Sequence, residues 1–118
     1  MTLTTPVERI CQLAAIFPRS GKSMAQLVHE SGIGNPAINF AIADALPVLE
    51  RDPSLIESWL LWSTNKRVSS GWSFQQDGPN FVVALHPSGE HLVFQHAALA
   101  CANFIVKEVG AIYARGAV

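Results

Sequence analysis

The chain has 118 residues, of which 49% are hydrophobic and 14% charged, and its formal net charge is −1. This composition excludes a disordered chain, and the length fits one domain, residues 1–118, with a substantial hydrophobic core. Because the net charge is so small, no overall field draws the protein to nucleic acid or to a lipid surface. The sparse charges leave surface for an interface, with a partner or in a homodimer.

The compartment is predicted from the cysteines and the N-terminus. Cys11 and Cys101 both fall in apolar helical patterns, which favours two reduced, buried thiols. The N-terminus lacks the cationic and apolar regions of a signal peptide. No stretch reaches the ~18 consecutive apolar residues of a membrane span. We therefore expect a cytoplasmic protein with no membrane partner.

The N-terminal half predicts four helices. They begin at Thr5-Pro6, Met24, Asn35-Pro36 and Asp52-Pro53, each marked by a capping residue or by Pro in the first turn. Pro18 ends the first helix, and Pro47 breaks or kinks the third. Apolar side chains at helical spacing give the third helix a buried face: Ala37, Ile38, Ala41, Ile42, Ala45 and Leu46.

The apolar period then changes from 3.6 to 2, which predicts three strands at residues 72–76, 81–86 and 91–96. With four-residue loops, Phe74 lies opposite Val83, Val83 opposite Phe94, and His86 opposite His91. A helix over residues 97–115 covers the apolar face, on which Trp72 is the expected anchor. The predicted fold is therefore α+β: four N-terminal helices, a three-stranded antiparallel meander, and a C-terminal helix packed on the sheet.

No group of residues predicts a catalytic site. Cys101 lies among small residues in a helix, and Ser69-Ser70-Gly71 lacks the pattern of a nucleophile elbow. His86 and His91 with Glu90 fall short of the four ligands usual for structural zinc. We expect no enzyme activity, no metal and no cofactor. A small enzyme remains a competing class, which a deep polar pocket or bound metal would favour.

A phosphate-loop interpretation of residues 20–23, Ser-Gly-Lys-Ser, fails on its context. Position 16 is Ile where that motif requires Gly, and a helix rather than a strand precedes the segment. A turn followed by a helix capped at Ser23 explains the same residues.

A helix-turn-helix pattern over residues 26–38 gives the alternative function, a DNA-binding regulator. Gly32, Ile33 and a buried Ile38 fall where that motif needs a turn and core residues. However, residues 26–50 contain no Lys or Arg, so contacts to phosphates would be missing. Nucleic acid is therefore an unfavoured partner.

Two segments carry a family resemblance. Residues 62–72 read Trp-Ser-Thr-Asn-Lys-Arg-Val-Ser-Ser-Gly-Trp, and residues 100–108 read Ala-Cys-Ala-Asn-Phe-Ile-Val-Lys-Glu. Together they resemble small bacterial immunity proteins of contact-dependent growth inhibition and related polymorphic toxin systems. The resemblance covers residues 55–112, and it implies a protein that occludes a cognate toxin domain without catalysis. Many such toxins are nucleases with basic clefts.

The acidic middle of the chain is the predicted partner-binding surface. Residues 23–65 carry five acidic side chains against one cation, Arg51. We assign partner binding to four of those acids: Asp44, Glu50, Asp52 and Glu57. The alternative is that these acids belong to an ordinary solvated helix face and bind no partner. The small net charge of the chain leaves the class of toxin open.

Overall fold

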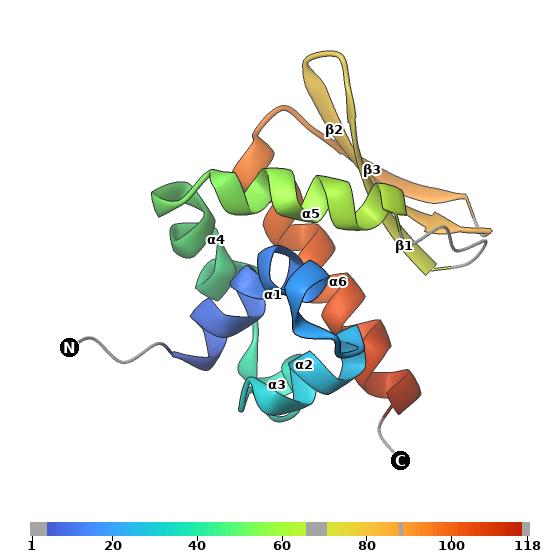
Figure 1. Ribbon diagram of the computed structural model, residues 1–118. Helices are drawn as coiled ribbons and strands as arrows, with labels where there is room; N and C mark the ends of the chain where they lie inside the picture. Colours follow the sequence, from blue (N-terminus) through green and yellow to red (C-terminus); the bar gives the residue numbers. More distant parts are fainter. Residues whose placement is uncertain (1–4, 66–70, 88, 117–118) are drawn as a thin grey trace.

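The sheet lies against one side of a group of six helices, in the computed structural model that describes residues 5–65, 71–87 and 89–116 (Figure 1). The helices are α1 (Pro6–Ser20), α2 (Met24–Glu30), α3 (Pro36–Asn39), α4 (Ile42–Arg51), α5 (Ser54–Asn65) and α6 (Ala97–Gly116). The strands are β1 (Gly71–Asp77), β2 (Asn80–His86) and β3 (Glu90–Phe94), in the order β1-β2-β3 and antiparallel. The predicted α+β meander with a C-terminal helix on the sheet is confirmed.

Helix α1 begins as predicted and ends later than predicted. The backbone N–H of Glu8 donates to Thr5 Oγ1 at 3.1 Å, and Glu8 Oε1 accepts from the Thr5 N–H at 3.1 Å. Pro18 does not end the helix, because it lies near the C-terminus and removes only one intrahelical hydrogen bond. The helix ends at Gly21, whose φ of 69° is the left-handed conformation that glycine adopts most readily.

The predicted third helix is two helices, because Phe40 is buried. Phe40 is extended (φ −140°) and 4% exposed, whereas Ile38, which was predicted to be buried, is 77% exposed. Asn39 Nδ2 donates to the carbonyl of Ile33 at 2.9 Å and holds the turn before the break. Helix α4 then continues through Pro47 to Arg51, so the predicted break at Pro47 is wrong.

The first strand pair has the predicted register and the second does not. Phe74 lies opposite Val83, as expected, but Val83 lies opposite Leu92, and Phe94 lies opposite Phe81. The last pair of the two strands is Leu85 and Glu90, so four residues still separate the last paired positions, but they begin one residue earlier than predicted. The N–H of Gly89, with φ 83°, donates to the Leu85 carbonyl at 3.1 Å and closes the loop there. This shift of the pairing by two residues preserves the faces of the sheet.

Helix α6 crosses the centre of the molecule and packs against all three strands. The five positions predicted for its apolar stripe are all buried: Ala98, Ala102, Ile105, Val109 and Ile112. Its residues Ala97–Arg115 are long and apolar enough for a membrane span, with mean hydropathy 1.4, and 56% of that window is buried inside the protein. Burial in the core accounts for this composition.

Trp59 joins three parts of the core. Its side chain is fully buried, and Nε1 donates to the carbonyl of Cys11 in α1 at 2.9 Å. Its ring meets Phe104 of α6 edge-on, with centroids 6.0 Å apart. Trp72, the predicted anchor, is only partly buried, and Lys107 Nζ lies 5.1 Å from its ring centroid. The core therefore depends on a tryptophan of α5 rather than on the one that opens β1.

Replacing Trp59 by Ala should lower the free energy of unfolding by about 3–5 kcal/mol, because a fully buried indole leaves a cavity. The matched variant Trp72→Ala should cost about half as much, since part of that ring is already solvated. Urea denaturation measures both. An equal or larger loss for Trp72→Ala would contradict this assignment of the core.

Ser63 of α5 anchors the free edge of β1. Its hydroxyl accepts a hydrogen bond from the Phe74 N–H at 2.7 Å, and Ser63 is 8% exposed. A strand at the edge of a sheet normally leaves such N–H groups to solvent or to another chain. Here a helix residue satisfies one of them within the core.

Replacing Ser63 by Ala should destabilise the fold by about 1–3 kcal/mol, because the buried N–H of Phe74 loses its acceptor. Thr64→Ala is the neighbouring control, since Thr64 is exposed and its hydroxyl donates to the Leu60 carbonyl of its own helix. We expect less than about 0.5 kcal/mol for the control. Similar thermal unfolding of the two variants would contradict a structural role for Ser63.

Candidate functional site

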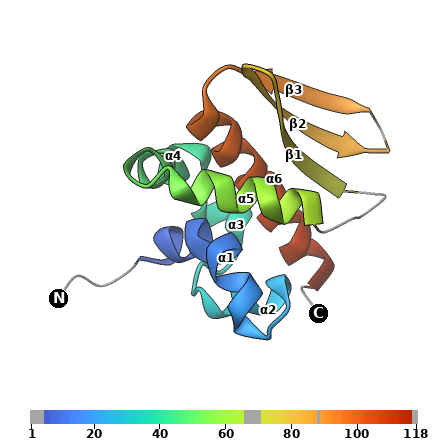
Figure 2. The same ribbon diagram turned by 45° about the horizontal axis from the view of Figure 1, so that its top comes forward.

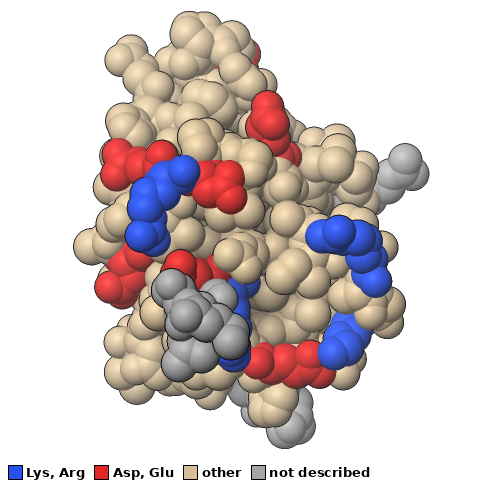
Figure 3. Space-filling view, turned by 60° about the vertical axis from the view of Figure 1, so that its left-hand side comes forward, with Lys and Arg blue, Asp and Glu red and all other residues tan. Residues whose placement is uncertain are grey.

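The four predicted partner-binding acids lie along α4, the turn after it and the start of α5. Asp44 and Glu50 belong to α4, Asp52 follows it, and Glu57 lies in the first turn of α5. All four are exposed. Figure 3 shows the face of the molecule that carries α4, where acidic groups and several basic groups both lie among neutral residues. The four acids therefore belong to a surface of mixed charge.

Two of these acids have local structural roles. Asp44 Oδ2 accepts the N–H of Ala41 at 2.9 Å and so caps the start of α4. Asp52 Oδ1 accepts the hydroxyl proton of Ser54 at 2.5 Å, directly before α5. A carboxylate at a helix start is favourable for the helix itself. Sequence reasoning assigned both to a partner. It had also placed Asp52 at the start of the following helix, but it missed that Asp44 caps α4.

The other two acids are more available. Glu50 Oε2 lies 3.8 Å from His96 Nε2, and both side chains are more than half exposed. Glu57 makes no hydrogen bond or ion pair within the part of the chain that the structure describes. Arg51 points toward α1, where its Nη2 lies 4.0 Å from Glu8 Oε2. Glu50 and Glu57 therefore present carboxylates on either side of the α4–α5 turn, which we name the acidic corner.

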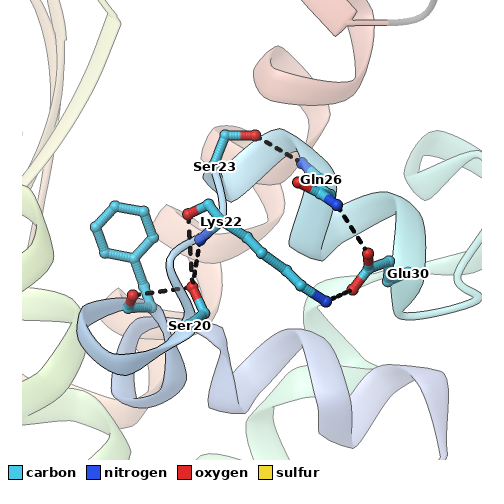
Figure 4. A network of polar contacts seen from close by, with 6 residues as sticks. Ser20, Lys22, Ser23, Gln26 and Glu30 are labelled. Carbon is cyan, nitrogen blue, oxygen red and sulfur yellow. Dashed lines mark hydrogen bonds and ion pairs between the residues drawn. The ribbon is translucent and has the colours of Figure 1, made fainter.

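The phosphate-loop-like segment is the turn between α1 and α2 (Figure 4). Lys22 Nζ lies 2.7 Å from Glu30 Oε1, and this hydrogen bond is the main reason that the pKa of Glu30 is lowered. Ser23 caps α2 by accepting the Gln26 N–H at 3.1 Å, as predicted. The lysine that would bind phosphate is already paired with a carboxylate at the end of α2.

The helix-turn-helix pattern does not form a reading helix. The helix after the turn, α3, has one turn and ends before Phe40, and Ile38 points away from the core. A recognition helix presents several residues to a major groove, which requires a longer rigid element.

The two hairpin histidines are not paired across strands. His86 lies opposite Gly71 and His91 opposite Ala84, which corrects the predicted His86–His91 pair. His86 Nε2 instead lies 3.0 Å from Ser73 Oγ, a contact that the sequence did not predict. Among the described residues no cluster of three or more metal-ligating side chains occurs. Nor does a third described group orient His86, as nucleophilic catalysis would require.

A hollow of about 980 Å³ lies between α1, α2, α5 and α6. Phe17, Trp62 and Ile112 contribute to its mainly apolar wall, and Leu61, 59% exposed, also lines it. Glu108, only 2% exposed, accepts a hydrogen bond from Trp62 Nε1 at 3.3 Å. Sequence reasoning missed this hollow because its residues come from four separate elements.

Some predicted residues lie outside the described ones. Lys66, Arg67 and the segment Ser69-Ser70, which belong to the first segment of the family resemblance, fall within residues 66–70 and are not among the described residues. Comparison with protein-family models, curated proteins and solved structures gives no match to this chain.

The two cysteines are buried and reduced, as expected. Burial raises the pKa of Cys11 to about 12, and it raises the pKa of Cys101 further. A protonated thiol is neither a good nucleophile nor a metal ligand.

Both thiols should therefore resist a thiol reagent at pH 8 and react only as the protein unfolds. Their unfolded pKa is near 9.0, so the folded state holds more protons between pH 9 and about 12. Stability should be unaffected below pH 8 and fall by up to about 1.4 kcal/mol per pH unit per thiol above pH 9. Cys101→Ala should flatten this fall, and urea titrations at pH 8, 9 and 10 measure it. Rapid labelling of the native protein would contradict the prediction.

Proposed function

We propose that this protein is a non-catalytic protein-binding module, namely an immunity protein that binds and blocks a cognate bacterial toxin domain in the cytoplasm. The observation that carries the proposal is the acidic corner. Glu50 and Glu57 are exposed on neighbouring rigid helices, and the nearby cation Arg51 is directed toward Glu8. Charges held on helices retain their geometry, which favours recognition of a partner with a basic cleft.

The mechanism is steric and electrostatic occlusion. Carboxylates at the acidic corner attract a basic surface at long range and accelerate the encounter, while the helices cover the cleft. Such a block requires a complementary surface and no cofactor. The resemblance to immunity proteins in residues 55–112 supports the same role independently of charge.

DNA binding has less support. The one-turn α3 and the absence of Lys and Arg from residues 26–50 both weigh against contacts with a duplex. A small enzyme also has less support, because the hollow between the helices has a mainly apolar wall. A salt-dependent shift of duplex DNA in a gel would favour DNA binding. Metal bound to the purified protein would favour a small enzyme.

The first experiment is titration calorimetry against the C-terminal domain of a large secreted protein encoded directly upstream. We expect 1:1 binding with a nanomolar Kd, near −12 kcal/mol. An absence of heat, together with no co-purification, would contradict the immunity function.

The double variant Glu50→Lys/Glu57→Lys should associate with the same toxin domain about tenfold more slowly and show a weaker salt dependence. We leave Asp44 and Asp52 unchanged, because each carboxylate makes a local hydrogen bond whose loss would also destabilise the fold. Stopped-flow association at two salt concentrations provides the measurement.

Two single charge-reversal variants with the same net charge as each other provide the control. Glu57→Lys and Asp77→Lys each change the charge by the same amount, but Asp77 lies at the end of β1, away from the corner. If both slow association equally, the effect comes from net charge and the acidic corner is not the contact.

A further inference from the structure

The outward face of α5 connects the acidic corner with the hollow between the helices. Figure 2 shows α5 running from α4 toward β1. The exposed residues of α5 recur at helical spacing: Ser54, Glu57, Leu61, Thr64 and Asn65. Glu57 and Leu61 are four residues apart, so their side chains are neighbours on this face. Leu61 and Asn65 also line the hollow, which therefore begins one helical turn from a carboxylate of the acidic corner.

The wall of the hollow consists mainly of apolar side chains. Its volume of about 980 Å³ lies near the upper end of the roughly 300–1,000 Å³ that ligand pockets span, so more than one bulky side chain fits. Phe17 and Trp62 meet edge-on in this wall, with ring centroids 4.8 Å apart. Leu61 is 59% exposed, and of the five large hydrophobic side chains exposed in the described part of the chain it is the one that lines the hollow. A partner that covers Leu61 and the two rings removes apolar surface from water.

Charge favours a basic protein segment as the occupant of the hollow. Among the described residues of the wall, Glu108 and Arg115 contribute one charge of each sign, so the wall has no net charge. Glu57 is the one charged residue of α5. An apolar small molecule would fill the hollow and leave Glu57 in water. A polypeptide with Lys or Arg one turn from its apolar side chains meets both Leu61 and Glu57, so charge complementarity favours it.

We propose that the hollow receives bulky apolar side chains of the same toxin domain whose basic surface meets the acidic corner. The occupant is an amphipathic segment of that domain, with Lys or Arg about one helical turn from aromatic or long aliphatic side chains. This inference rests on the proposed function and assigns a different step to each surface. Glu50 and Glu57 accelerate the encounter, whereas burial of Leu61 against the partner slows dissociation.

The variant Leu61→Asp separates this proposal from binding by charge alone. It adds a carboxylate one turn from Glu57, so charge alone would strengthen the binding of a basic partner. If Leu61 is covered by the partner, the new carboxylate loses its water, and dissociation should be at least about tenfold faster while association changes less than about twofold. Stopped-flow association and dissociation of the full chain with the toxin domain used for calorimetry measure both rates.

Ile38→Asp is the matched control. Ile38 is 77% exposed and undergoes the same change of charge, but it belongs to α3, which is not among the helices whose described residues line the hollow. Both of its rates should match those of the wild type.

The indole N–H of Trp62 supplies a readout that requires no substitution of Leu61. In the free protein it donates to Glu108 at 3.3 Å in the wall of the hollow. Its resonance, assigned by its loss in Trp62→Phe, should shift when unlabelled toxin domain saturates the labelled protein. This readout decides the question even if Leu61→Asp fails to fold.

The outcomes separate this inference from the function on which it rests. A wild type that does not bind the toxin domain overturns the proposed function and this inference with it. Where the wild type binds, a folded Leu61→Asp that dissociates no faster overturns this inference alone. An equal acceleration in Ile38→Asp, or a Trp62 resonance that stays in place in the saturated complex, does the same.

Discussion

Three buried aromatic rings connect the helices to the sheet, and the rest of the structure depends on them. Trp59 of α5 meets Phe104 of α6 edge-on at 6.0 Å, and Phe104 stacks on Phe74 of β1 at 5.5 Å. Such pairs add about 0.5–1.5 kcal/mol beyond the area they bury. The hydrogen bond from Trp59 to Cys11 extends the connection to α1. These contacts fix α5 beside β1, and α5 carries Glu57 of the acidic corner.

Local signals predicted much of this arrangement. The capping box of Thr5 and Glu8 specifies where α1 begins, because both hydrogen bonds lie within one turn. Apolar residues alternate along both β1 and β2 on either side of a tight turn. This pattern places Phe74 opposite Val83 and so specifies the β1–β2 register. The stripe from Ala98 to Ile112 identified the buried face of α6. In each case the residues that decide the structure are close in sequence or repeat with one period.

Three features could not be predicted from the sequence, each for a different physical reason. Phe40 interrupts a continuous helical pattern because its burial outweighs the helix propensity of its neighbours, and that preference depends on the core around it. The β2–β3 register depends on where Gly89 turns the chain rather than on strand pattern, since both registers keep the same face inside. Of the four predicted acids, Asp44 and Asp52 were assigned a partner because sequence shows charge but not which N–H or hydroxyl that charge already meets.

Helix α5 runs from the acidic corner to the β1 side of the sheet (Figures 1 and 2), so the contacts made by Trp59 also fix where Glu57 lies. On the other side of the corner, Glu50 Oε2 lies 3.8 Å from His96 Nε2, in the short segment that joins β3 to α6. The two carboxylates are therefore positioned by different parts of the same core, Glu57 by α5 and Glu50 beside the chain that leads into α6. Both remain exposed. A pair of charges held in this way keeps its geometry when a partner approaches, which is what recognition of a basic cleft requires.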